Sequence, residues 1–137
     1  GGLRVHTMAK DGDFDGRVLA LRRAIRTRNY GPFARNAMRL YINTLRPAVD
    51  AMDPGITDLV LIVDGVLAFI PFEALISRPA PNEENYTDLE YVLKRFNVRY
   101  TYSATLLHQQ HQYWRAGGQG GERPANSFLA FAPVFGG

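Results

Sequence analysis

The sequence predicts a mixed α/β fold, with an N-terminal helical hairpin followed by a β-hairpin, a further strand and a last strand. Three observations predict this class. Apolar residues recur at helical spacing early in the chain, a dense apolar run surrounds Asp64 and Gly65, and short alternating or apolar segments follow it. We expect a lead-in at residues 1–12 and the helical hairpin at residues 13–52. A subdomain of β-hairpin, strand and helix is expected at residues 53–116, a Gly-rich linker at 117–126 and the last strand at 127–137.

Two apolar stripes predict the helical hairpin. In the first helix the stripe consists of Phe14, Val18, Leu21 and Ile25. Acidic residues precede this helix, where the helix dipole favours them, and residues 29–31 end it. Pro32 can open the second helix, whose stripe consists of Phe33, Ala37, Leu40, Tyr41, Thr44 and Leu45. Pro47 predicts a restart near Arg46, and the sequence Asp-Pro-Gly at residues 53–55 predicts a turn.

The densest apolar stretch, residues 58–75, is predicted to contain the β-hairpin. Residues 59–63 form a run of leucine and β-branched residues that suits a strand buried on both faces. Asp64 and Gly65 then supply a tight turn, because Gly tolerates a positive φ angle, and residues 66–70 form the second strand. Asp64 could also serve as a catalytic carboxylate on a strand end, but the turn explains it better.

The segment after the hairpin mixes short elements. Pro71 ends the second strand and can start a helical turn that includes Phe72 and Glu73. We expect the Glu73 carboxylate to cap a backbone N–H or to pair with an Arg, a structural part rather than an acid–base one. Residues 86–95 are compatible with a short helix that Thr87 caps.

The last third of the chain is predicted to hold a strand, a helix, a linker and another strand. Residues 96–102 alternate apolar and polar side chains, which predicts a strand with one buried face. Ser103 is expected to cap a helix that ends near residue 114. The linker lies at residues 117–126, and residues 128–132 are a buried strand. We interpret four aromatic residues as core rather than as a stacking platform: Phe96, Tyr100, Tyr102 and Trp114.

Composition limits the functions that these residues can perform. The 137 residues are 46% hydrophobic, which suits one globular domain, and they include no Cys that could form a disulfide or act as a nucleophile. No apolar run approaches the roughly 20 residues that cross a bilayer, and no signal peptide is evident, so we expect a cytoplasmic protein without a membrane partner. Because the chain lacks an initiator Met and a complete catalytic constellation, we expect it to be part of a larger protein.

The basic residues are unevenly distributed. Seven arginines and no acidic residue lie within residues 17–39, an arginine block that consists of Arg17, Arg22, Arg23, Arg26, Arg28, Arg35 and Arg39. Such a block could contact nucleic-acid phosphates or an acidic partner. We favour a solvated helix face whose charges meet acidic neighbours elsewhere in the protein, because no interleaved aromatics or Gly-rich loop accompany the block. Nucleic acid is therefore not the expected partner.

Two histidines have a spacing that a metal site could use. His108 and His111 are three positions apart on the predicted helix, so both imidazoles could share one face. No carboxylate or third His lies near them in the sequence, and His6 lies in the lead-in without an evident partner. We therefore predict surface or packing roles for these residues, with no metal and no other cofactor.

Four blocks of the sequence, in order, resemble the N-terminal half of CHAT domains, a caspase-like family that is often found beside tetratricopeptide repeats. The same blocks resemble separases more distantly. The blocks are residues 40–52 (LYINTLRPAVDAM), 59–76 (LVLIVDGVLAFIPFEALI), 91–107 (YVLKRFNVRYTYSATLL) and 128–135 (FLAFAPVF). The most specific part is IPFEAL at residues 70–75, and Val63 departs from the Pro that the family often has before Asp-Gly.

The resemblance implies that the chain ends just after the first strand of a caspase-like α/β sheet. Peptidases of the family use a His in a His-Gly pair and a Cys, at the ends of two later strands, and neither has a match here, so no catalytic residue is assigned. The resemblance gives structural parts to six residues: Asp64, Gly65, Pro71, Phe72, Glu73 and Ser103. In an active parent, it implies that a thiolate attacks a peptide carbonyl while the His moves protons.

Two functions from different classes follow from this resemblance. The chain is expected to be the non-catalytic N-terminal portion of a bacterial CHAT-type cysteine peptidase, whose partners are the remainder of the domain, a tetratricopeptide-repeat region and a protein substrate. The alternative is a CHAT-like module that has lost catalysis and acts as an interaction domain. Binding of nucleic acid through the arginine block is a weaker third reading.

Overall fold

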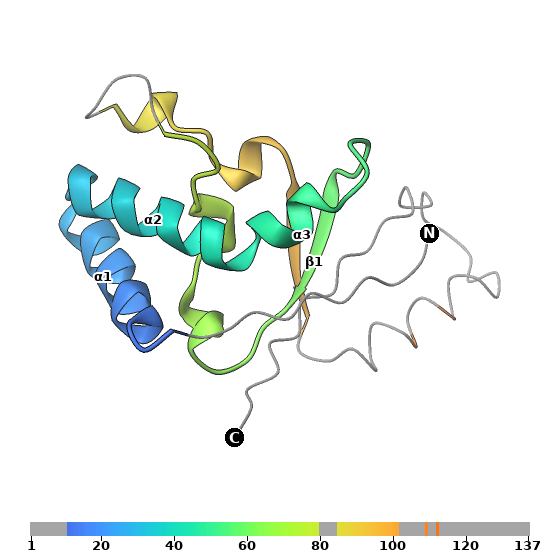
Figure 1. Ribbon diagram of the computed structural model, residues 1–137, viewed down its shortest axis with the longest axis horizontal. Helices are drawn as coiled ribbons and strands as arrows, with labels where there is room; N and C mark the ends of the chain where they lie inside the picture. The colour runs from blue at the N-terminus through green and yellow to red at the C-terminus, as the bar shows by residue number, and fades with distance from the viewer. Residues whose placement is uncertain (1–10, 80–84, 102–108, 110–111, 113–137) are drawn as a thin grey trace.

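The computed structural model describes residues 11–79, 85–101, 109 and 112. Three helices, α1 (Phe14–Thr27), α2 (Tyr30–Thr44) and α3 (Arg46–Asp50), precede two strands, β1 (Asp58–Ile62) and β2 (Asn97–Thr101). Between the strands lie the 3-10 helices η1 (Gly65–Phe69), η2 (Phe72–Ala74), η3 (Tyr86–Asp88) and η4 (Val92–Lys94). Figure 1 shows α1 and α2 as a hairpin, with the two strands side by side beyond α3. The predicted mixed α/β class with an N-terminal helical hairpin is confirmed.

One hydrophobic core joins the helices to β1 and to the 3-10 helices. It takes buried side chains from most of the described elements, including Leu21, Leu40, Val49, Leu61, Leu67, Phe72 and Val92. The buried hydroxyl of Thr44 donates a hydrogen bond of 2.6 Å to the carbonyl of Leu40, so this polar group is satisfied inside the core. The core thus fixes the helical hairpin against the segment that follows β1.

The stripe predicted for α2 is confirmed in full, because all six residues are buried. The stripe predicted for α1 is confirmed at Phe14, Val18 and Leu21 but is wrong at Ile25, which is 43% exposed. Ala24 is buried instead, because α2 starts only a few residues later and packs on that side of the last turn. Ile25 faces two surface pockets.

The ends of the helices follow local rules. α3 restarts the chain at Arg46 with Pro47 in its first turn, as predicted. The N–H of Ile56 donates to the carbonyl of Asp53 at 3.1 Å, which confirms the predicted turn. α1 ends in a Schellman motif whose left-handed residue is Arg28, with φ 52°. Because a left-handed backbone costs a residue other than Gly about 1–2 kcal/mol, Arg28 is a strained position.

The predicted β-hairpin is wrong. β1 pairs with β2 in parallel, from Asp58 opposite Asn97 to Ile62 opposite Thr101, and the expected second strand is the 3-10 helix η1. The Asp64 carboxylate accepts the N–H of Gly65 at 2.6 Å and caps η1, although Gly65 does take a positive φ of 57°.

Burial explains why this stretch is not a strand. Within residues 66–70 the buried side chains are Leu67 and Ile70, three positions apart as one 3-10 turn places them, and not two apart as a strand would. The strongest local signal for a hairpin therefore gave way to the packing of these two residues.

The two strands differ in burial. The centre of β1 is buried on both faces, as predicted, since Leu59, Val60 and Leu61 are all buried. β2 confirms the strand predicted within residues 96–102, but its expected buried face is incomplete. Val98 is half-buried, whereas Tyr100 is 43% exposed, so the prediction that Tyr100 belongs to the core is wrong.

The helix predicted at residues 86–95 is replaced by η3 and η4. An antiparallel bridge joins Ile76 to Tyr91, and the N–H of Val92 donates to the carbonyl of Leu75 at 2.9 Å. These long-range bonds take the backbone groups that a continuous helix needs. Thr87 is not the cap, because the Asn85 side chain accepts the N–H of Thr87 at 3.0 Å.

Several predictions lie outside the described residues. Among them are the cap at Ser103, the linker at 117–126 and the strand at 128–132, together with Tyr102, Trp114 and the three histidines His6, His108 and His111. Gln109 and Gln112 are described and are helical, in agreement with the helix predicted there. Among the helices of the described part, none is both long and apolar enough to cross a bilayer.

Candidate functional site

The segment with the sequence IPFEAL, residues 70–75, is fixed by three buried side chains. Ile70, Phe72 and Leu75 point into the core, while Pro71 and Glu73 are only partly covered. Pro71 precedes η2 as its N-cap residue rather than lying inside its first turn. We call residues 70–75 the motif segment. Its apolar side chains anchor it, which leaves Glu73 at the surface on a rigid backbone.

Tyr100 ties the motif segment to β2. Its hydroxyl donates a hydrogen bond of 2.5 Å to Oε2 of Glu73 and accepts the backbone N–H of Phe72 at 3.2 Å. The hydroxyl thereby satisfies an N–H at the start of η2 that has no partner within the helix. The sequence suggests that Glu73 caps a backbone N–H or pairs with an Arg. Among the described residues, its carboxylate instead accepts the Tyr100 hydroxyl.

The environment keeps the Tyr100 phenol protonated. Partial burial and then the neighbouring Glu73 carboxylate raise the pKa of Tyr100 above its ordinary value near 10. An ionised phenolate would lie against the negative carboxylate and could no longer donate to it. Burial also raises the pKa of Tyr41 and of Tyr91.

We expect alkaline pH to destabilise the fold partly through Tyr100. The folded-state pKa is raised, so this contribution to the unfolding free energy is complete below about pH 10 and is lost as pH rises further. Urea unfolding of the wild type and of Tyr100→Phe, at about pH 8 and about pH 11, should show a smaller alkaline loss in the variant. Ionisation of Tyr41 and Tyr91 should cause the loss of unfolding free energy that remains in the variant. Equal alkaline losses in the wild type and in Tyr100→Phe would contradict the prediction.

Three surface pockets adjoin one another around the C-terminal end of α1. The first, of about 650 Å³, includes Arg22, Ile25 and Pro71 in its lining, and the second, of about 590 Å³, shares Ile25 and Pro71 with it. The third, of about 720 Å³, shares Arg28 with the second. We call these three neighbouring pockets the groove. The motif segment thus forms part of the groove wall through Pro71 and Glu73.

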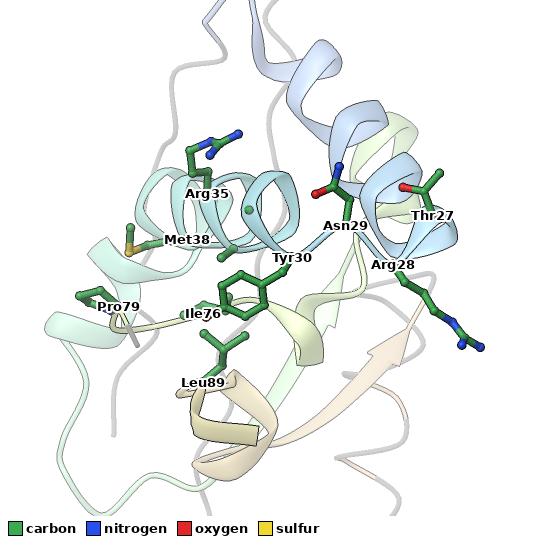
Figure 2. Close-up of a pocket in the computed structure, with 11 residues that line it drawn as sticks. Thr27, Arg28, Asn29, Tyr30, Arg35, Met38, Ile76, Pro79 and Leu89 are labelled. Carbon is green, nitrogen blue, oxygen red and sulfur yellow. The ribbon is translucent and has the colours of Figure 1, made fainter. Parts of the chain in front are cut away.

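The third pocket has an apolar floor and a basic margin. Figure 2 shows the ring of Tyr30 extending from the start of α2 toward Ile76 and Leu89. The side chains of Arg28 and Arg35 point away from this ring on opposite sides. The left-handed backbone of Arg28 is what turns the chain between α1 and α2 at this point.

The arginine block is only partly neutralised. Arg17 pairs with Asp11 at 2.8 Å, and the Arg22 guanidinium lies 4.9 Å from the centre of the Phe69 ring. The other five are exposed and form no ion pair with any residue that the structure describes: Arg23, Arg26, Arg28, Arg35 and Arg39. The expectation of a solvent-exposed face agrees with this burial.

The remaining predicted site residues have structural surroundings. Asp64 caps η1 and is exposed, so the catalytic reading of this carboxylate receives no support. Phe96 is buried, as expected for a core aromatic. Within residues 11–79 and 85–101, no three His, Cys, Asp or Glu side chains gather as metal ligands would. Sequence reasoning missed the link through Tyr100, because its two partners lie 27 and 28 positions earlier and leave no local signal.

Comparison with family models identifies the family of the chain. The family model of the CHAT domain matches residues 32–130, a range that includes most of α2, both strands, the motif segment and Tyr100. Searches of curated proteins and of solved structures returned no significant match. The match extends over more than half of the 137 residues. The chain therefore belongs to the CHAT domain family, which is caspase-like and related to peptidases.

Proposed function

We propose that this chain is the non-catalytic N-terminal portion of a CHAT-type cysteine peptidase and that it supports the protease fold. The observation that carries the proposal is the position of the motif segment, the most family-specific stretch of the sequence. Phe72 and Leu75 are buried in the core, and Glu73 is held by Tyr100. The segment is built to fix the backbone between β1 and β2 rather than to present a reacting group.

The Glu73–Tyr100 pair is poorly suited to acid–base catalysis. The phenol hydroxyl already donates to Glu73 and accepts from Phe72, so it has no free proton to offer a substrate. Its raised pKa also makes it a weaker acid near neutral pH. The sequence contains no Cys, so a thiolate that attacks a peptide carbonyl, with a His that moves the protons, would come from other parts of the parent protein.

Peptide hydrolysis tests the proposed function. The 137-residue chain alone should not hydrolyse peptide substrates, whereas the parent protein should, and replacing one of its cysteines with Ala should abolish that activity. In the parent, Glu73→Gln combined with Tyr100→Phe should lower activity in proportion to the loss of folded protein, without changing the pH profile of the remaining enzyme. Peptidase activity that survives replacement of every Cys would disprove the cysteine mechanism.

A second candidate function is a CHAT-like interaction module without catalysis. The apolar floor of the groove favours this alternative, as do its arginines that form no ion pair with any residue in the described part of the chain. This alternative would be supported if the parent sequence has neither a His-Gly pair nor a Cys at strand ends and if the parent protein shows no measurable peptide hydrolysis. Binding of nucleic acid through the arginine block is weaker, because Arg17 and Arg22 already have partners; absence of DNA or RNA binding at low salt would exclude it.

A further inference from the structure

Exposed apolar side chains gather along the groove. Seven large hydrophobic residues are exposed in the described part of the chain, and two of them, Leu19 and Ile42, lie away from the groove. The other five line its first or second pocket: Ile25, Phe69, Tyr86, Leu93 and Tyr100. Clustered exposure of this kind marks an interaction surface, whereas scattered single residues would need no explanation.

The three pockets of the groove offer successive depressions on one surface. Its three pockets are neighbours that share lining residues, Ile25 and Pro71 for the first two and Arg28 for the last two. In an extended peptide, side chains that face the same way recur every second residue, about 7 Å apart. Successive depressions can therefore each take one side chain of such a peptide.

The charge of the groove selects the kind of peptide. Each pocket is lined by at least one arginine of the block, Arg22 in the first, Arg28 in the second and both Arg28 and Arg35 in the third. The only carboxylate among the described lining residues is Glu73, which already accepts the Tyr100 hydroxyl. Arg28 and Arg35 have no carboxylate partner within residues 11–79 and 85–101, and guanidinium groups of this kind beside apolar walls are suited to bind Asp or Glu side chains bidentately.

The aromatic rings of the groove argue for a peptide and against single-stranded nucleic acid. Base stacking needs an open ring face. The Phe69 ring is covered by Arg22, and the Tyr86 ring packs edge-on against Tyr30 with centroids 5.0 Å apart. Both rings can contribute apolar contacts to a side chain, but neither is an isolated platform.

We propose that the groove binds an extended acidic segment of a partner protein. Apolar side chains of the segment enter the pockets, and its carboxylates pair with Arg28 and Arg35. Arg22 contributes from its position over Phe69. The proposal concerns a surface that the peptidase scaffold does not explain, and it holds whether or not the parent is catalytic.

Fluorescence anisotropy with the 137-residue chain tests the proposal. The probe is a labelled peptide of about twelve residues in which Glu alternates with Leu or Phe, and the matched probe has Gln in place of every Glu. We expect the acidic peptide to bind and the Gln peptide to bind at least about tenfold more weakly, with affinity falling as salt rises. No binding of the acidic peptide at about 1 mM protein, or equal binding of both peptides, would overturn the proposal.

Two charge reversals on α2 provide a matched comparison. Arg35→Glu should weaken binding of the acidic peptide by about tenfold or more, because it places a carboxylate at the third pocket. Arg39→Glu, one helical turn away, changes an exposed arginine that lines none of the three pockets, so it should alter affinity by less than about twofold. Both substitutions are at exposed positions, and equal thermal melts will verify folding.

The remaining outcomes assign the groove to other occupants. If a labelled oligonucleotide binds more tightly than the acidic peptide and Arg35→Glu removes that binding, the occupant of the groove is nucleic acid. Self-association in sedimentation velocity that the same variant removes would identify a second copy of the chain as the occupant. If Arg35→Glu and Arg39→Glu lower the affinity for the acidic peptide equally, the net charge of the chain, and not the groove, explains the binding. Each of these three results overturns the proposal.

Discussion

Replacing Phe72 with Ala should lower the unfolding free energy by about 3–5 kcal/mol. Phe72 is only 1% exposed and is the largest fully buried side chain of the described residues. Its neighbours cannot close the cavity easily, because the buried Ile70 and Leu75 hold the motif segment on both sides. Since a domain of this kind is stable by only about 5–15 kcal/mol, the loss should be visible as a large fall in the urea midpoint, followed by circular dichroism.

Phe69→Ala is the control for this substitution. Phe69 lies three positions earlier but is 54% exposed, and the Arg22 guanidinium lies over its ring. Its replacement should cost less than about 1 kcal/mol. Equal losses of unfolding free energy in Phe69→Ala and Phe72→Ala would contradict the burial of Phe72 in the core.

Leu21→Ala should lower the unfolding free energy by about 2–5 kcal/mol. Leu21 is 0% exposed in α1 and belongs to the core that joins the helical hairpin to the rest of the chain. Its removal leaves a cavity beneath a helix that α2 holds in place, so the site cannot collapse fully. The midpoint of thermal unfolding should fall accordingly.

Leu19→Ala is a closely matched control, since it makes the same change in the same helix. Leu19 is 61% exposed, and Ala has a slightly higher helix propensity than Leu, so the variant should remain within about 0.5 kcal/mol of the wild type. A large loss in Leu19→Ala would mean that the outer face of α1 is covered in solution. In that case the unfolding free energies of Leu19→Ala and Leu21→Ala would differ less than expected.

The helical hairpin could be predicted from the sequence because its determinants are local. The apolar stripe of α2 follows the helical period, and Pro47 marks the restart at Arg46. Ile25 fits the same period but lies at the end of α1, where the position of α2 decides which side is covered. Periodicity describes a helix face and does not specify how far along the helix a neighbour extends.

The β-hairpin could not be excluded from local signals. Asp64 and Gly65 between two apolar runs are the strongest sequence signal for a two-residue turn, yet the actual partner of β1 is β2. The same limit of local signals applies to the candidate site. The structural parts of Asp64, Phe72 and Glu73 followed from turn chemistry and from the family resemblance, whereas the Tyr100 link required two distant segments to meet.

Because β1 pairs in parallel with β2, the stretch that carries the family signature, residues 58–75, cannot form its native structure without a distant part of the chain. Every pair in the ladder joins residues 39 positions apart, from Asp58 with Asn97 to Ile62 with Thr101. The loop that joins β1 to β2 must bring its two ends together before β1 gains a partner. A piece of the chain that ends before Asn97 leaves one edge of β1 without these hydrogen bonds. Residues 58–75 grafted into another protein would carry the signature but not its fold, because the supporting strand is encoded far downstream.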